Sequence, residues 1–154
     1  MELSFEAGSW WSYALVFLAA ATPVLEVLVV IPAAVLAGMP PGPTTLLALA
    51  GNLSTVVLVG VAGDRIIESW RARRPDRDRQ PSRRTRRARE LAQRWGVPGL
   101  AFLAPLTTGT HVATVAALAT GAGTRRVLRW MAAGLVFWSL AVVVVTVAGF
   151  EAFR

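Results

Sequence analysis

The sequence lacks cysteine and lysine, contains one histidine, and has long runs without a charged side chain. Without cysteine the chain can form no disulfide and no thiolate metal site. Its sixteen basic residues are all arginine, and twelve of them fall between Arg65 and Arg94. Apolar blocks precede and follow this stretch. Such a pattern predicts an integral membrane protein whose arginine-rich stretch is cytoplasmic.

The composition also argues against other classes of protein. With 154 residues that are 55% hydrophobic, the chain is too apolar for a soluble domain of its size. The net charge of +7 comes from arginines in a connector, so nucleic-acid binding is not expected. No Ser/His/Asp set, phosphate loop or metal-ligand spacing occurs, which favours a protein that is not an enzyme and needs no cofactor or metal. We expect a multi-pass protein of a bacterial inner membrane.

The first apolar block predicts a hairpin followed by a membrane span. Residues 44–63 are uncharged and long enough to cross a bilayer once. The far end of this span then lies outside, at the proline-rich turn 39–43. Because no arginine precedes it, the run 9–38 is expected to enter and return on the same side, with Pro23 near the reversal.

The second apolar block repeats this plan in the opposite orientation. Arginines flank both ends of residues 96–123, so this run is also expected to enter and return, and residues 127–150 then cross outward. We therefore predict an all-α integral membrane protein with two inverted repeats. Each repeat is a re-entrant broken-helix hairpin followed by a transmembrane helix.

The predicted organisation is one membrane domain over residues 1–154, with the first repeat at 9–63 and the second at 96–150. Between them, residues 64–95 form a cytoplasmic arginine-rich loop with a short amphipathic helix, because apolar residues recur there at helical spacing. A bundle of four crossing helices is the alternative. That bundle would place the arginines at 125–129 outside, against the positive-inside bias.

Glu26 and His111 stand alone in their apolar blocks and are the predicted transport and proton-coupling residues. A charged side chain at the bilayer centre costs about 2.5–3.5 kcal/mol on insertion scales. Desolvation disfavours the ionised carboxylate, which would bring proton uptake toward physiological pH. If the repeats pack about a two-fold axis, His111 could share this proton. The alternative for both residues is a structural polar group that satisfies nearby backbone.

Other residues are expected to break the hairpins or to line a cavity where the broken helices meet. Prolines, glycines and threonines at such breaks interrupt helices or satisfy the freed backbone groups. Asn52 is expected to face the cavity, since its amide cannot remain unsatisfied in hydrocarbon. The residues of this group are Pro23, Pro32, Asn52, Pro105, Thr107, Thr108 and Gly109.

The run PVLEVLVVIP at 23–32, followed by Gly38 and the Gly-Asn pair at 51–52, resembles the small multidrug export protein family, a distant relative of the DedA membrane proteins. The PLTTG motif at 105–109 resembles the second conserved loop of that family. The resemblance covers residues 20–60 and 95–150. Two departures stand out, because the family commonly has arginine at the position of Leu28 and often an aromatic residue near His111.

The resemblance implies two re-entrant hairpins that meet in the membrane and proton-coupled movement of a lipid-linked or amphipathic substrate. Half-helices that begin after the breaks would favour an anionic group such as a phosphate. We therefore expect a transporter or lipid translocase whose partners are protons and membrane lipids, among them polyprenyl phosphate or phospholipid. An exporter of hydrophobic cations and a non-transporting scaffold are the alternatives, and assembly as a homodimer stays open.

Overall fold

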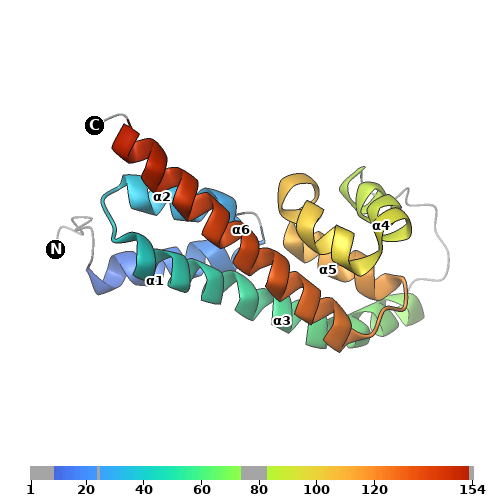
Figure 1. Cartoon of the computed structure of the whole chain (residues 1–154). Helices are drawn as coiled ribbons and strands as arrows, with labels where there is room; N and C mark the ends of the chain where they lie inside the picture. Colours follow the sequence, from blue (N-terminus) through green and yellow to red (C-terminus); the bar gives the residue numbers. More distant parts are fainter. Residues whose placement is uncertain (1–8, 24, 74–82, 153–154) are drawn as a thin grey trace. The chain divides into compact units, whose positions relative to one another are not determined.

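The structure is a computed structural model that describes residues 9–23, 25–73 and 83–152. Within these residues it contains six helices and no strand, which confirms the all-helical prediction (Figure 1). The helices are α1 (Trp10–Ala21), α2 (Val27–Leu36), α3 (Pro41–Arg73), α4 (Arg83–Thr107), α5 (Thr110–Ala119) and α6 (Thr124–Ala152).

Two of the described helices are long and apolar enough to cross a membrane. These are Pro41–Gly63, the apolar part of α3, and Thr124–Ala152, which is α6. They include the predicted crossings 44–63 and 127–150. By contrast, α1, α2 and α5 have 12, 10 and 10 residues. About 20 residues are needed to cross the hydrocarbon core, so these three helices are too short to cross alone.

The predicted arginine-rich loop is helical at both of its ends. The helix α3 continues as far as Arg73, and α4 begins at Arg83. The part of the loop at 74–82 lies outside the described residues. Gly96 has φ 66° and ψ −170°, so α4 consists of two helical parts, 83–95 and 97–107, joined at a sharp kink. The first part corresponds to the predicted amphipathic helix.

The helices α1 and α2 contact each other and run in opposite directions (Figure 1). At the start of α1, the Oγ of Ser9 accepts a hydrogen bond of 3.4 Å from the Ser12 N–H. At its end, Thr22 is extended, with φ −77° and ψ 140°. A proline disfavours helical geometry in the residue before it, so Pro23 accounts for the end of α1 at this point.

The backbone from α2 to α6 contains an internal repeat. Both α2 and α5 have ten residues, and a connection of four residues leads from each into a long helix. Counterparts are 83 residues apart, as shown by the helix starts at Val27 and Thr110. The glycines at 38 and 121 are also counterparts, with φ of 91° and 84°. This left-handed conformation is favourable for glycine after a helix. The predicted inversion of the repeats across a membrane stays a prediction.

The chain divides into two compact units. Unit 1 comprises Met1–Ser54 and Leu135–Arg154, and unit 2 comprises Thr55–Gly134. The helices α1 and α2 belong to unit 1, whereas α4 and α5 belong to unit 2. Each unit also includes one part of α3 and one part of α6, so the division passes through the two long helices.

Within each unit, a glycine lets a long helix approach the backbone of a shorter one. In unit 1, a Cβ on Gly51 would collide with the carbonyl oxygen of Phe17 in α1. In unit 2, a Cβ on Gly134 would lie 2.5 Å from the carbonyl oxygen of Ala101 in α4. Gly51 and Gly134 are 83 residues apart and both buried. The two halves of the repeat therefore use the same close helix–helix packing.

We expect Gly51→Ala and Gly134→Ala each to lower the free energy of unfolding by about 1–3 kcal/mol, the usual cost of overpacking. The new methyl group would meet a backbone carbonyl, which cannot move as a flexible side chain does. Gly149→Ala is the matched control, because nothing lies within 4 Å of a Cβ at that helical position. Unfolding in mixed micelles, followed by circular dichroism, measures all three. Wild-type stability of Gly51→Ala and Gly134→Ala would contradict the close packing.

Candidate functional site

The break between α1 and α2 places a carboxylate in a buried position. Glu26 is only 7% exposed and is the residue directly before α2. Its carbonyl accepts hydrogen bonds from the N–H groups of Val29 at 2.9 Å and Val30 at 3.1 Å. Its side chain does not cap the helix. The carboxyl group therefore lies at the positive end of the α2 dipole without satisfying the first turn itself.

Hydroxyl groups satisfy part of the backbone that this break exposes. The Oγ1 of Thr22 donates to the carbonyl of Ala19 at 2.7 Å and accepts from the N–H of Leu25 at 3.3 Å. Such side-chain bonds replace intrahelical bonds where a helix is interrupted. Pro23 itself is exposed. It therefore belongs to the break, whereas Glu26 is buried.

The break between α4 and α5 contains three of the predicted residues, Thr107, Thr108 and Gly109. The N–H groups of Thr108 and Gly109 both donate to the carbonyl of Ala104, at 3.0 and 2.8 Å. Gly109 has φ 89° and precedes α5 directly. The Oγ1 of Thr107 donates to the carbonyl of Leu103 at 2.8 Å. The chain thus reverses between α4 and α5 with these backbone groups hydrogen-bonded locally.

His111 is buried in the first turn of α5, with 6% of its surface exposed. Its Nε2 lies 2.8 Å from the Oγ1 of Thr55 in α3, and either atom can be the donor. Its Nδ1 is buried and makes no hydrogen bond within the described part of the chain. A protonated imidazole would carry an N–H at Nδ1 without an acceptor. The arrangement in unit 2 therefore suits the neutral ring.

The remaining predicted residues lie inside helices. Pro32 is half-buried within α2, which continues through it, and Pro105 is in the last turn of α4. Neither proline lies at a point where the chain reverses. Asn52 is fully buried in α3, within unit 1. The expectation that Asn52 faces a cavity stays a prediction.

The predicted proton-coupling residues belong to different units. Glu26 is in unit 1, whereas His111 is in unit 2 with the α4–α5 break. Proton sharing between the two side chains stays a prediction. Each of them lies at the start of a short helix. Glu26 is the residue before α2, and His111 is the second residue of α5.

The sequence analysis missed Thr55, the hydrogen-bond partner of His111. One signal for it is its spacing from Asn52, which is expected to face the cavity. Thr55 follows Asn52 by three residues and so lies on the same side of the helix. Another signal is the need of a buried imidazole for at least one hydrogen-bonding partner. The sequence alone does not indicate which of the threonines in the chain supplies it.

An ionisable side chain lies beside each of the two breaks. A carboxylic acid and an imidazole can each accept and release one proton, and both are buried next to a helix start. Among the described residues, no group of three or more His, Cys, Asp or Glu could hold a metal ion. The fold and these positions define an all-helical protein with two membrane-length helices and ionisable groups at helix breaks.

Comparison with known families identifies the chain more closely. A family model described as "Putative small multi-drug export protein" matches residues 26–141, about three quarters of the chain. The chain therefore belongs to the small multidrug export family, as the resemblance predicts. No curated protein and no solved structure matches the chain. Family membership and the two apolar helices together indicate a membrane protein and, at a coarse level, a transporter.

The hydrogen bond between Thr55 and His111 can be tested through stability. We expect Thr55→Val to lower the free energy of unfolding by about 1–3 kcal/mol, because valine has a similar shape but leaves the buried imidazole unsatisfied. Thr55→Ser keeps the hydroxyl group and is the matched control. A double-mutant cycle with His111→Phe, measured in mixed micelles, isolates the pair. A coupling energy near zero would show that the hydrogen bond does not contribute.

Proposed function

We propose that the protein is a proton-coupled transporter or lipid translocase of the DedA type, which moves a lipid-linked phosphate or another amphipathic substrate. The observation that carries this proposal is the buried position of Glu26 at the break between two half-helices. An ionisable group at membrane depth is costly and is normally retained for function. Transporters commonly place their sites at such discontinuous helices.

In this proposal Glu26 carries the coupling proton. Burial favours the neutral acid, whereas the helix dipole of α2 favours the carboxylate. These opposing effects allow a modest change of surroundings to exchange the proton. Access to water on one side and a bound substrate on the other would be such a change.

His111 is the second proposed proton-coupling residue. Its Nε2 is engaged by Thr55 and its Nδ1 has no acceptor in the described part of the chain. Proton uptake at Nδ1 therefore requires an acceptor to approach it. A carboxylate or an anionic substrate would satisfy this need. We propose that the neutral ring belongs to one step of the cycle and the protonated ring to another.

The proposed substrate class follows from the helix starts at the two breaks. Helix N-termini carry partial positive charge and bind anions. A phosphate on a lipid carrier matches this field better than a cation does. Leu28 stands where the family commonly has arginine, so His111 and the helix termini would have to supply the positive charge near the breaks.

A second candidate is export of hydrophobic cations. The family description names multidrug export without a substrate class, and a buried carboxylate such as Glu26 could bind a cation directly. In that case, the proton and the cation would compete for the same oxygen atoms. A non-transporting scaffold is the third alternative, although it gives the buried Glu26 no role.

We propose a protein without enzymatic activity, in a bacterial inner membrane, with its arginine-rich segment in the cytoplasm. Its partners would be protons and membrane lipids such as polyprenyl phosphate or phospholipid, and not nucleic acids. A homodimer is compatible with this function. The internal repeat from α2 to α6 supports the plan of two related halves.

Proton coupling can be measured in proteoliposomes with a fluorescent phosphatidic acid and, separately, with a fluorescent hydrophobic cation. We expect Glu26→Gln to reduce proton-dependent movement at least tenfold, because glutamine cannot exchange a proton. His111→Ala should mainly shift the pH profile. Glu151→Gln is the matched control, because Glu151 is exposed at the end of α6. Full activity of Glu26→Gln would exclude coupling through this residue. Movement of the cation alone would favour the second candidate.

The topology can be tested because the chain has no cysteine. Single cysteines replace Ala7, Gly42, Ser82 and Thr124, and intact cells are treated with an impermeant thiol reagent. Two re-entrant hairpins predict labelling at positions 7 and 42 only, with positions 82 and 124 protected until lysis. Labelling of position 124 in intact cells would mean that the second apolar block crosses the membrane.

A further inference from the structure

The first part of α4, residues 83–95, combines a high positive charge with a one-sided apolar pattern, and is called the arm from here on. It contains six arginines and one glutamate. Its apolar residues recur at helical spacing and so share one side of the helix. They are Ala88, Leu91, Ala92 and Trp95. The arginine side chains that the structure describes in the arm are exposed, namely Arg83, Arg87 and Arg94.

The apolar side of the arm ends in an exposed tryptophan. Trp95 is 60% exposed, although tryptophan side chains are mostly buried in soluble proteins. Residues 97–107, directly after the kink in α4, contain no charged side chain. Tryptophan is enriched where a membrane meets water. Trp95 thus lies between a cationic helix and an apolar one, which is the order expected at a membrane surface.

The kink after Trp95 is a tightly packed joint. Gly96 has φ 66°, a left-handed conformation that favours glycine. Pro98 is in the first turn of the second part of α4, where proline is well tolerated. A Cβ on Gly99 would collide with the Cβ of Trp95 and would lie 3.2 Å from its Cγ. The side chain of Trp95 is therefore held against the backbone of the second part, within unit 2.

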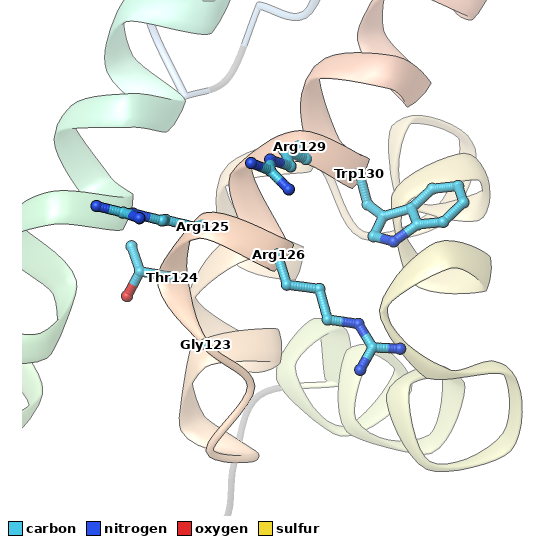
Figure 2. Close-up of a pocket in the computed structure, with 6 residues that line it drawn as sticks. All are labelled: Gly123, Thr124, Arg125, Arg126, Arg129 and Trp130. Atoms are coloured by element: carbon cyan, nitrogen blue, oxygen red, sulfur yellow. The ribbon is translucent and has the colours of Figure 1, made fainter.

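Another group of arginines in unit 2 lacks such an arrangement. At the start of α6, Arg125 extends to one side of the helix and Arg126 to the other (Figure 2). These two side chains present no common surface to one partner. They therefore provide a charge-matched control for the arginines of the arm.

We propose that the arm binds anionic phospholipids at the membrane surface. Its arginines would contact the headgroup phosphates, while its apolar side and Trp95 would enter the boundary between headgroups and acyl chains. Charge complementarity favours anionic lipids as the partner. Each arginine near an anionic leaflet strengthens such binding about fivefold.

The joint gives this binding a structural consequence. Because Trp95 packs on Gly99, an arm that lies on the membrane surface sets the direction in which residues 97–107 leave that surface. The positive-inside bias accounts for many arginines in this region, but it accounts for neither the apolar side nor the joint. The inference does not depend on transport, so an inactive Glu26→Gln variant would leave it unaffected.

Spin labels in lipid nanodiscs test the proposal, because the chain has no cysteine. Single cysteines replace Ala92 on the apolar side and Gln93 on the opposite side of the arm. Accessibility to oxygen, divided by accessibility to a water-soluble nickel chelate, reports membrane depth. In nanodiscs that contain phosphatidylglycerol, we expect this ratio to be at least threefold higher at position 92 than at position 93. Phosphatidylcholine alone should lower the ratio at position 92 at least twofold.

The variant R87Q/R94Q should also lower the ratio at position 92 at least twofold in the anionic nanodiscs, whereas R125Q/R126Q should leave it unchanged. An equal loss in both variants would overturn the proposal, because net charge would then explain the effect. Equal ratios at positions 92 and 93 would also overturn it, in favour of an arm that lies in water and suits a soluble acidic partner. Equal ratios at position 92 in the two lipids would exclude anionic phospholipid as the partner.

Gly99→Ala tests the joint in the same nanodiscs. The new methyl group would displace Trp95, so we expect the ratio at position 92 to fall at least twofold. Gly149→Ala is the matched control, because nothing lies within 4 Å of a Cβ there. A wild-type ratio in Gly99→Ala would show that the contact between Trp95 and Gly99 does not hold the arm in place.

Discussion

The fold depends on one constraint, which is that every backbone polar group away from water needs a hydrogen-bond partner. The described chain interrupts its helices at two breaks, each beside a buried ionisable side chain. At the first break the hydroxyl group of Thr22 bonds both the preceding and the following backbone. At the second break the carbonyl of Ala104 accepts two N–H groups. These local bonds allow ionisable side chains to lie beside the ends of short helices.

Close backbone contact is the second element of the architecture. The contacts at Gly51 and Gly134 bring a long helix against the carbonyl of a shorter one in each unit. Small residues allow this approach, and in a membrane they replace the hydrophobic driving force that is absent between helices. This close contact occurs at equivalent positions of the repeat, which supports the view that the two halves follow one plan.

Much of this architecture is predictable because its signals are local. Uncharged runs ending at arginines predict the two long helices, and Pro23 marks the end of α1. The hydrogen bond from Thr55 to His111 joins residues 56 positions apart, and no local pattern encodes that distance. The inverted repeats at 9–63 and 96–150 stay a prediction. The spacing of 83 residues between α2 and α5, and between α3 and α6, depends on helix lengths that the sequence does not display.

The two halves of the repeat have similar backbones, but the side chains at equivalent positions differ. Glu26 corresponds to Gly109, and His111 corresponds to Leu28. A duplicated scaffold with identical residues would have two halves of equal energy, and exchanging their roles would cost nothing. Here, one half carries a carboxylic acid and the other an imidazole, so the two halves differ in the chemistry that they offer. The two halves are therefore not interchangeable, even though their helices follow one pattern twice.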